Sequence, residues 1–500
     1  MDIEGNVRLD YSNLFFDHLS FSMGIGSELT TTKTQEDGYT ATGFVNDKLT
    51  YPSYAQQFQK NGKPSGYFDK GRTIGFFGNI NIGWDNRYIA DFSLRTDGSS
   101  RFGRDNQFAP FWSVGLAWNV NREKFWTGTG SMKIRASVGS VGSSKFSADQ
   151  ALTRFVYNSD GEYNGIYGAE LLQYGNTALK WQNTLKYNLG LDMTVWKNII
   201  TLNFDAYLER TENLLMDVDV APSTGFTSYK ENMGSLDNKG IEARLRLNLL
   251  RGDDKGWNWN VTLSASHERD KIRKLSNAMK AMNAEAMKIE NNTDSTSVFT
   301  MYEVGRSQKA LMLVKSLGID PATGNELYLK RDGSTTFDYD PNDRVEVGNT
   351  TPKIQGFINT NLSWNHIELY MAFNYEYGAK IYNSTLAQKV EGASPYQNAD
   401  KRVLYDRWKK PGDIAMFRRI DDQGPVYQSS RLVQKNNYIR MSSLSLTYDI
   451  PREKLARTFI ERCKFTFSMT DVFRISSIKQ ERGTSYPFAW TYSFGVNLTF

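Results

Sequence analysis

The chain ends on Phe488-Ala489-Trp490-Thr491-Tyr492-Ser493-Phe494-Gly495-Val496-Asn497-Leu498-Thr499-Phe500, in which large apolar residues alternate with small or polar ones. Successive side chains of a β-strand point to opposite faces, so this stretch predicts a strand with one apolar and one hydrophilic face. A long apolar face that ends on a terminal aromatic residue is typical of a strand that contacts lipid on one side and water on the other. We therefore expect an all-β fold, a transmembrane antiparallel β-barrel.

The bulk composition looks like that of a soluble protein, with a mean hydropathy of -0.54 and 39% apolar residues. No stretch approaches eighteen uninterrupted apolar residues, which excludes transmembrane helices. A barrel strand turns only half of its residues toward lipid and therefore escapes a hydropathy scan. The 27 Tyr, 29 Phe and 11 Trp supply interfacial aromatics, and the low count of 12 Pro leaves strand ladders intact.

Net charge, cysteine content and the N-terminal sequence bear on partners, disulfides and export. A net charge of +5 over 60 basic and 55 acidic residues is too small to indicate a nucleic-acid partner. Cys463 is the single cysteine, so no internal disulfide is expected. The start Met1-Asp2-Ile3-Glu4-Gly5 lacks the basic and apolar regions of a signal peptide. We expect the precursor of an exported barrel to begin upstream of it.

Strand-like alternation recurs along the whole chain. Apolar residues share one face in the segments 74–84, 88–94, 112–120, 185–195, 200–208, 241–249, 257–265, 367–377 and 444–450. The connections alternate in length: short turns are predicted near 13–17, 84–87, 121–130, 196–198, 251–255, 365–366 and 451–462. Long polar loops are predicted near 30–70, 98–109, 142–181, 213–235, 271–352, 381–436 and 475–485. Short turns at one end and long loops at the other are typical of outer-membrane barrels.

The strand count is close to fifteen, from a first strand near 5–12 to a last one that ends at Phe500. Bacterial single-chain barrels have an even number of strands. An unpaired strand edge in lipid would leave its backbone N–H and C=O groups without hydrogen bonds. We therefore expect residues 5–12 to pair with a strand that precedes Met1 or belongs to a companion chain.

Several segments resemble one known family. They are Arg87-Tyr88-Ile89-Ala90-Asp91-Phe92-Ser93-Leu94-Arg95-Thr96-Asp97-Gly98-Ser99-Ser100-Arg101-Phe102-Gly103, Pro110-Phe111-Trp112-Ser113-Val114-Gly115 to Trp118, Asn232-Met233-Gly234, Asn238-Lys239-Gly240-Ile241-Glu242, Gly318-Ile319-Asp320-Pro321-Ala322-Thr323-Gly324, Tyr438-Ile439-Arg440 through Leu444-Ser445-Leu446-Thr447-Tyr448, and Tyr486-Pro487-Phe488. In this order and spacing, from about residue 70 to the terminus, the chain resembles the SusC/RagA family of TonB-dependent outer-membrane transporters of Bacteroidetes.

This resemblance implies a barrel of about 22 strands around an N-terminal plug, so fifteen strands would leave the plug and the first strands absent from this chain. It also implies a SusD-like surface lipoprotein as partner, a TonB complex that acts through the plug, and import of a glycan or oligopeptide. The chain, residues 1–500, would be the C-terminal part of the barrel. A barrel-assembly signal is implied at the end of the chain, in Trp490, Tyr492, Phe494, Val496, Leu498 and Phe500.

No catalytic constellation is apparent, and we do not expect an enzyme. His18, His267 and His366 are scattered, with no second ligand type at metal spacing. No cofactor is expected, although Ca²⁺ could bind the acidic loop 338–343 with Asp320 and Asp332 nearby. The candidate residues facing the lumen are Asp91, Arg95, Asp97, Glu368 and Glu376. The candidate loop aromatics for stacking on a cargo are Tyr396, Tyr405, Trp408 and Tyr427.

Two other classes of function remain open. A passive diffusion porin would need an even strand count and a constricting inner loop. A soluble glycan-binding or carbohydrate-active all-β protein would need polar outer faces and paired carboxylates at strand ends. The apolar strand faces and the missing acid pair favour the membrane protein, and only the family resemblance separates an importer from a porin.

Overall fold

The computed structural model describes the chain except residues 45, 47, 49–50, 59–64, 104–105, 144–152, 220–227, 253–255, 276–278, 281–282, 285–300, 394–395, 397–399, 423, 457 and 479–489. The chain divides into two compact units. Unit 1 comprises Met1–Leu116, Ser137–Lys186 and Thr211–Met233, and unit 2 comprises Ala117–Ala136, Tyr187–Arg210 and Gly234–Phe500.

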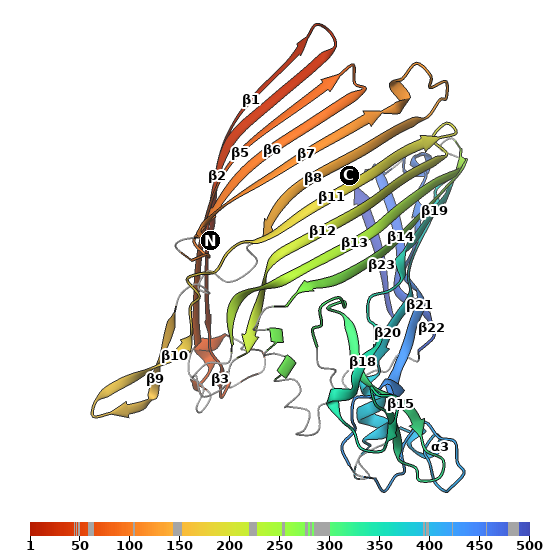
Figure 1. The fold of residues 1–500 in the computed structure, drawn as a ribbon. Coiled ribbons are helices and arrows are strands. Elements are labelled where there is room, and N and C mark those ends of the chain that lie inside the picture. Colours follow the sequence, from red (N-terminus) through yellow and green to blue (C-terminus); the bar gives the residue numbers. More distant parts are fainter. Residues whose placement is uncertain are drawn as a thin grey trace. The chain divides into compact units, whose positions relative to one another are not determined.

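One large sheet contains most of the strands (Figure 1). In the described part of the chain it has fifteen strands, in the order β1-β2-β5-β6-β7-β8-β11-β12-β13-β14-β19-β20-β21-β22-β23. Their bounds are β1 Asp2–Phe15, β2 Leu19–Gly38, β5 Ser65–Trp84, β6 Tyr88–Ser99, β7 Phe108–Asn119, β8 Ser131–Ser143, β11 Gln182–Val195, β12 Ile200–Asp219, β13 Ser228–Arg251, β14 Trp257–Lys274, β19 Ile354–Trp364, β20 Ile367–Tyr382, β21 Val433–Asp449, β22 Arg462–Ser476 and β23 Thr491–Thr499. The predicted large antiparallel sheet of about fifteen strands is confirmed.

In unit 1, the strands extend further than the sequence pattern indicates. Strands β2 and β5 pair from Leu19 opposite Trp84 to Gly38 opposite Ser65, so the predicted loop 30–70 is much shorter than expected. Twenty residues per strand exceed the nine to eleven that a transmembrane strand needs. The reason is that Thr-rich polar sequence still forms strands when a paired neighbour supplies the hydrogen bonds. The predicted turn after Trp84 is tight, with Asp85 and Asn86 in the left-handed region.

Unit 1 also holds shorter elements. They are β3 Ala41–Thr42 paired with β4 Gln57–Phe58, the single turn η1 Pro52–Tyr54, and the hairpin of β9 Arg154–Tyr163 and β10 Ile166–Gln173 within the predicted loop 142–181. A small core forms where Phe102 stacks on Trp181 at 4.2 Å beside the buried Leu179. This core ties the ends of the 100–107 and 174–181 connections together.

In unit 2, both faces of the strands show the chemistry predicted by alternation. On one face Leu369 lies opposite Leu362, and Phe373 lies opposite Ile358. On the other face Glu368 lies opposite Ser363. Trp257 and Trp364 stack at 5.3 Å where β14 and β19 meet the short turns, which is the position of an interfacial aromatic belt. The strand order begins at β1, which pairs with β2, and ends at β23, which pairs with β22.

Two long connections of unit 2 fold into a compact body, which we name the loop cap: residues 301–353, between β14 and β19, and residues 383–432, between β20 and β21. Its sheet has the order β17-β16-β15-β18. The elements are β15 Ala310–Ile319, β16 Glu326–Leu329, β17 Thr335–Thr336, β18 Arg344–Asn349, and the single turns η6 Pro341–Asp343, α2 Ser384–Leu386, η7 Ala387–Glu391, α3 Arg402–Tyr405 and η8 Ser430–Leu432. Elsewhere in unit 2 lie η3 Val120–Arg122 and α4 Arg452–Leu455.

The loop cap has a hydrophobic core of its own. The core is formed mainly by residues of the two connections and consists of Leu313, Tyr382, Leu386, Ala387, Val390, Val403, Phe417 and Leu432. The expectation of long polar loops at 271–352 and 381–436 is therefore incomplete, because apolar residues from the two loops bury one another. Among the residues that the structure describes, no helix is long and apolar enough to cross a membrane.

Candidate functional site

The polar face of unit 1 carries the first group of predicted residues. Arg95 donates through Nε to Oδ1 of Asp97 at 2.6 Å, and through Nη2 to Oε2 of Glu28 at 3.0 Å. Asp91 accepts a hydrogen bond from the amide of Asn81. Arg95, Asp97 and Asp91 thus share one face, as alternation predicts, and they belong to a ladder of paired charges. This ladder makes the face hydrophilic while leaving little net charge on it.

The polar face of unit 2 surrounds a cavity of about 790 Å³. At one side of it, Arg135 of β8 holds two carboxylates from neighbouring strands. Its Nε donates to Asp192 at 2.8 Å, and its Nη2 donates to Asp205 at 3.1 Å. Asn203 adds a bond to Asp192 at 2.8 Å. Without the guanidinium, the carboxylates of Asp192 and Asp205 would repel each other across the β11–β12 ladder. Arg135 therefore stabilises the contact between these strands.

The opposite side of the same cavity holds Glu376. Its Oε1 accepts a hydrogen bond from the Tyr438 hydroxyl at 2.7 Å, and its Oε2 accepts one from Asn436 at 3.4 Å. Between the two sides, the Arg244 guanidinium lies 5.7 Å above the Phe357 ring. Glu368, the other predicted residue of β20, accepts from Asn361 at 2.8 Å and is not among the residues that line the cavity. The wall therefore offers carboxylates, guanidinium groups, amides and one aromatic ring to whatever occupies the lumen.

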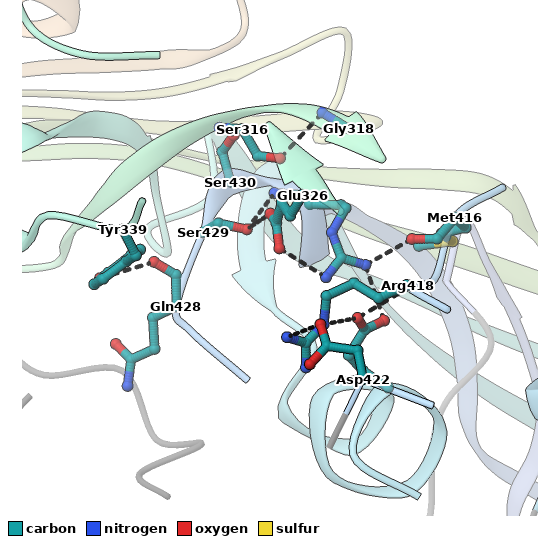
Figure 2. Close-up of polar contacts among 12 residues, drawn as sticks. Ser316, Gly318, Glu326, Tyr339, Met416, Arg418, Asp422, Gln428, Ser429 and Ser430 are labelled. Carbon is teal, nitrogen blue, oxygen red and sulfur yellow. Dashed lines mark hydrogen bonds and ion pairs between the residues drawn. The ribbon is translucent and has the colours of Figure 1, made fainter. Parts of the chain in front are cut away.

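The loop cap contains a buried chain of charges (Figure 2). Arg431 lies between two carboxylates, with 2.9 Å from Nη2 to Oε2 of Glu326 and 3.0 Å from Nη1 to Oε2 of Glu391. Arg418 extends the chain, with 2.8 Å to Glu391 and 2.9 Å to Asp422. The side chain of Glu391 is fully buried. Four loop segments are joined by these contacts, so the network fixes the form of the cap.

The charges of this network keep one another ionised. Burial alone would raise the pKa of Glu326, but the Arg431 guanidinium and the Ser429 hydroxyl hold that pKa below its ordinary value. Burial likewise opposes the charge on Arg431, yet Glu326 and Glu391 raise its pKa. The aromatic residues beside the network respond to burial, which raises the pKa of Tyr328 and of Tyr382. Glu326 and Arg431 therefore stay charged and hold the loop segments together.

The acidic residues considered for Ca²⁺ serve the turns of the cap. Asp320 accepts from the amide and hydroxyl of Thr323, at 3.1 and 2.7 Å. Asp332 accepts from the amide of Ser334 at 2.8 Å, and Asp340 accepts from that of Asn342 at 2.9 Å. Among the described residues, no group of three or more His, Cys, Asp or Glu side chains converges as metal ligands. Calcium binding stays a prediction.

The predicted loop aromatics fall into two sets. Tyr396 and Tyr405 are exposed, at 95% and 74%. Trp408 and Tyr427 are half-buried and contact other residues of the cap: the Trp408 indole donates to the Pro321 carbonyl at 2.9 Å, and Tyr427 stacks on Tyr339 at 4.4 Å. The first set is the more exposed of the two.

A family model described as "TonB dependent receptor-like, beta-barrel" matches residues 3–302, more than half of the chain. This chain belongs to the TonB-dependent receptor family.

Two curated relatives support the assignment. The TonB-dependent receptor P3 of Formosa agariphila is 26% identical over 94% of this chain and 50% of its own length. The TonB-dependent receptor SusC of Bacteroides thetaiotaomicron is 30% identical over 45% of this chain and 23% of its own length. The chain spans about half the length of P3 and less of SusC. Like other TonB-dependent receptors, it is an outer-membrane β-barrel protein of the SusC-like type, and its family is one of transporters and receptors.

A solved structure of the RagAB peptide transporter shares the fold. It superimposes on the whole of this chain and 55% of its own chain, with a TM-score of 0.85 and 23% identity. We therefore expect the apolar strand faces of this receptor to contact lipid and the polar faces, with Arg95, Arg135 and Glu376, to face the lumen.

The last strand described in this chain is β23. The apolar residues in and directly beside it, Trp490, Tyr492, Phe494, Val496, Leu498 and Phe500, are all exposed, as is every residue of the strand. Phe494 lies opposite Phe467 in the register and Phe500 stacks on Phe459 at 5.6 Å. The role of these residues as an assembly signal stays a prediction.

Sequence reasoning missed Arg135 and the charge network of the cap. Arg135 had a usable signal, because Ser131, Lys133, Arg135 and Ser137 alternate with Met132, Ile134, Ala136 and Val138 and so indicate a polar strand face. Glu326, Glu391 and Arg431 had none, since each stands alone in its own loop and only the fold brings them together.

Proposed function

We propose that this receptor imports a glycan or an oligopeptide across the outer membrane, driven by a TonB complex. In this proposal the chain supplies the barrel wall and the extracellular cap, and a plug fills the lumen. The observation that carries the proposal is the cavity of about 790 Å³ on the lumen face, lined by Arg135, Asp205, Glu242, Arg244 and Glu376. A wall with many charged hydrogen-bonding groups suits a protein plug that must bind and then move.

The plug and further strands would complete the barrel. Strands β1 and β23 stand at the two ends of the strand order, and in lipid each needs a further hydrogen-bonded neighbour. A segment that carries the plug and the missing strands, either in the same polypeptide or as a companion chain, would supply both neighbours. The shared fold with the RagAB peptide transporter, of whose chain this chain covers 55%, supports this arrangement.

The loop cap is the proposed docking platform for a SusD-like surface lipoprotein. It exposes Tyr396, Tyr405 and Ile414, at 95%, 74% and 95%. Exposed apolar side chains on a body that is rigidly held by a buried ion network are typical of a protein contact surface. The pair of receptor and lipoprotein would enclose the cargo above the plug. The RagAB peptide transporter supports the oligopeptide class, and the glycan class rests on the resemblance to the SusC/RagA family.

The proposal is tested by uptake in cells. A strain that lacks the receptor is complemented with the wild type, and the entry of fluorescent oligopeptides and of fluorescent oligosaccharides is measured with and without a proton uncoupler. We expect entry of one cargo class that stops when the proton gradient is dissipated. Entry that is unaffected by the uncoupler would indicate the passive porin instead, and uptake equal to that of the deletion strain would overturn the proposal.

A further inference from the structure

On the outward face of the adjacent strands β12, β13 and β14, apolar residues give way to basic residues at the same height. Along β12 the apolar positions end at Leu208 and the next outward residue is Arg210. Along β13 they end at Ile241, and the next is Lys239. On β14, Trp257, Trp259, Val261, Leu263 and Ala265 are followed by His267, Arg269, Lys271 and Arg273. The change lies toward the end of the strands that carries the loop cap.

The position of this change coincides with the edge of the hydrocarbon layer. From Trp257 in the aromatic belt to His267 is ten residues of β14. At a rise of about 3.3 Å per residue and a strand tilt of about 40°, this corresponds to a height of about 25 Å. The apolar band of an outer-membrane barrel is about 25 Å tall. Arg269 and Lys239 therefore lie among the headgroups of the outer leaflet.

Three of the cations at this level lack an ion-pair partner in the described part of the chain. Lys239 and Arg269 are opposite each other in the β13–β14 register, and like charges in this position repel. Among the described residues, Lys239, Arg269 and Lys271 form no ion pair. The nearby Asp237 is already shared by Arg210 at 3.1 Å and Arg273 at 3.5 Å. Five outward cations of these strands, Arg210, Lys239, Arg269, Lys271 and Arg273, thus lie near one outward carboxylate of this unit, Asp237, so an external anion would relieve the repulsion.

The cations also border a formed cavity. Pairing of β14 with β19 ends at Ser266 opposite Gln355, which leaves a notch in the wall above that level. The notch is a cavity of about 850 Å³, lined by Leu208, by the cations Lys239, Arg269, Lys271, Arg306, Lys353 and Lys380, and by the carboxylates Asp237, Glu268, Asp270 and Glu346. Of these carboxylates, Glu346 pairs with Arg306, Glu268 pairs with Lys309, and Asp270 accepts a hydrogen bond from Ser307. His267 closes its lower edge through a contact of 2.5 Å from Nδ1 to the Lys353 carbonyl. A volume of this size accommodates a small-molecule headgroup.

We propose that this notch binds the phosphorylated headgroup of an outer-leaflet lipid. The Arg269 guanidinium and the Lys239 and Lys271 ammonium groups supply the donors that phosphate oxygens require. The apolar residues directly below, Leu208 and Ile241, continue into the lipid-facing surface and would contact the acyl chains. This continuity distinguishes a lipid from a free anion or a cargo, both of which would lack the chains.

The test is a binding measurement on the purified receptor in detergent. Phosphorylated lipid A, enzymatically dephosphorylated lipid A and inorganic phosphate are each titrated, and bound molecules are counted by native mass spectrometry. The test variant is Lys239→Gln, Arg269→Gln, Lys271→Gln. The control variant is Lys401→Gln, Lys409→Gln, Lys410→Gln, which removes the same charge from the loop cap. Heat-dependent gel mobility checks that both variants are folded.

Phosphorylated lipid A should bind the wild type and the control equally. The test variant should bind it about a hundredfold more weakly, because each cation near an anionic headgroup contributes about a factor of five to ten. Dephosphorylated lipid A should bind all three proteins weakly. Equal binding of phosphorylated lipid A to the test variant and the wild type would overturn the proposal. Displacement of the lipid by inorganic phosphate at a similar concentration would also overturn it, in favour of a free-anion site.

Discussion

Arg431 donates to Glu391 across 3.0 Å in the interior of the loop cap, although forty residues separate the two in the chain. The same guanidinium reaches Glu326, which lies in the connection before β19, at 2.9 Å. One buried cation therefore holds the two long connections against each other. The predicted partner surface of the cap depends on this contact, because the exposed aromatics sit on the segments that it fixes.

Replacement of Arg431 should destabilise the cap strongly. Arg431→Met leaves the buried carboxylates of Glu326 and Glu391 without their cation, and removal of one partner from a buried ion pair costs about 3–5 kcal/mol. We expect rapid cleavage of the loop cap by an added protease while the heat-dependent gel mobility of the barrel is unchanged. Lys409→Met, at an exposed position of the same cap, serves as the control. Equal protease resistance of Arg431→Met and the control would contradict the structural role of the network.

The cap should also be sensitive to acid. The folded-state pKa of Glu326 lies below its ordinary value of 4.5, so its stabilising contribution is complete above about pH 4.5. The contribution is lost as the pH falls through the lower, folded-state value. Protease resistance of the cap, measured with an acid-active protease from pH 6 to pH 2.5, should decline in that window. In Glu326→Gln the resistance should be lower throughout and the decline shallower; an unchanged decline would assign the acid sensitivity to other groups.

Arg135 and Asp192 should be energetically coupled across the lumen wall. In a double-mutant cycle with Arg135→Met and Asp192→Asn, the double variant should be more stable than the sum of the single losses predicts. Interaction energies between contacting charged residues are about 0.5–3 kcal/mol. Unfolding in urea from lipid vesicles gives the four stabilities. As a control, the losses of unfolding free energy in a cycle of Arg135→Met with Asp422→Asn, in the cap, should be additive. Additive losses in the cycle of Arg135 and Asp192 would show that their contact does not contribute to stability.

The terminal aromatic residue should matter for assembly more than for packing. Phe500→Ala should reduce the amount of receptor in the outer membrane, measured by immunoblot of membrane fractions, if the end of β23 is the assembly signal. Phe459→Ala removes the ring that stacks on Phe500 but leaves the terminus intact, so its level should stay near that of the wild type. A similar fall in both variants would assign the effect to lost stacking.

The main sheet could be predicted from the sequence because its signal is local. Alternation along 367–377 or 491–499 depends only on neighbouring residues, and lipid on one face makes the contrast strong. The ends of β2 and β5 were less predictable. Beyond the membrane both faces meet water, so the pattern fades while the ladder from Leu19 to Gly38 continues.

The loop cap could not be predicted in this way. Leu313 and Phe417 share a core, yet neither lies in a segment with clear periodicity, and they come from connections on either side of the β19–β20 hairpin. Of the predicted lumen residues, Glu376 lines the cavity while Asp91, Arg95 and Asp97 form their own ladder in unit 1. Tyr405 and Trp408 lie in the same loop but differ in exposure. The difference depends on tertiary contacts, such as the hydrogen bond from the Trp408 indole to the Pro321 carbonyl.

The central claim, that alternate residues of these strands contact lipid and water, can be measured by spin labelling along β20. Single cysteines from Ile367 to Tyr377 are introduced into a Cys463→Ser background, and collision rates with oxygen and with a water-soluble nickel complex are recorded in lipid vesicles. We predict high oxygen collision at Leu369, Met371 and Phe373, and high nickel collision at Glu368, Tyr370 and Asn374. Profiles without this period of two, or nickel access at every position, would contradict the assignment of the strands to a membrane wall.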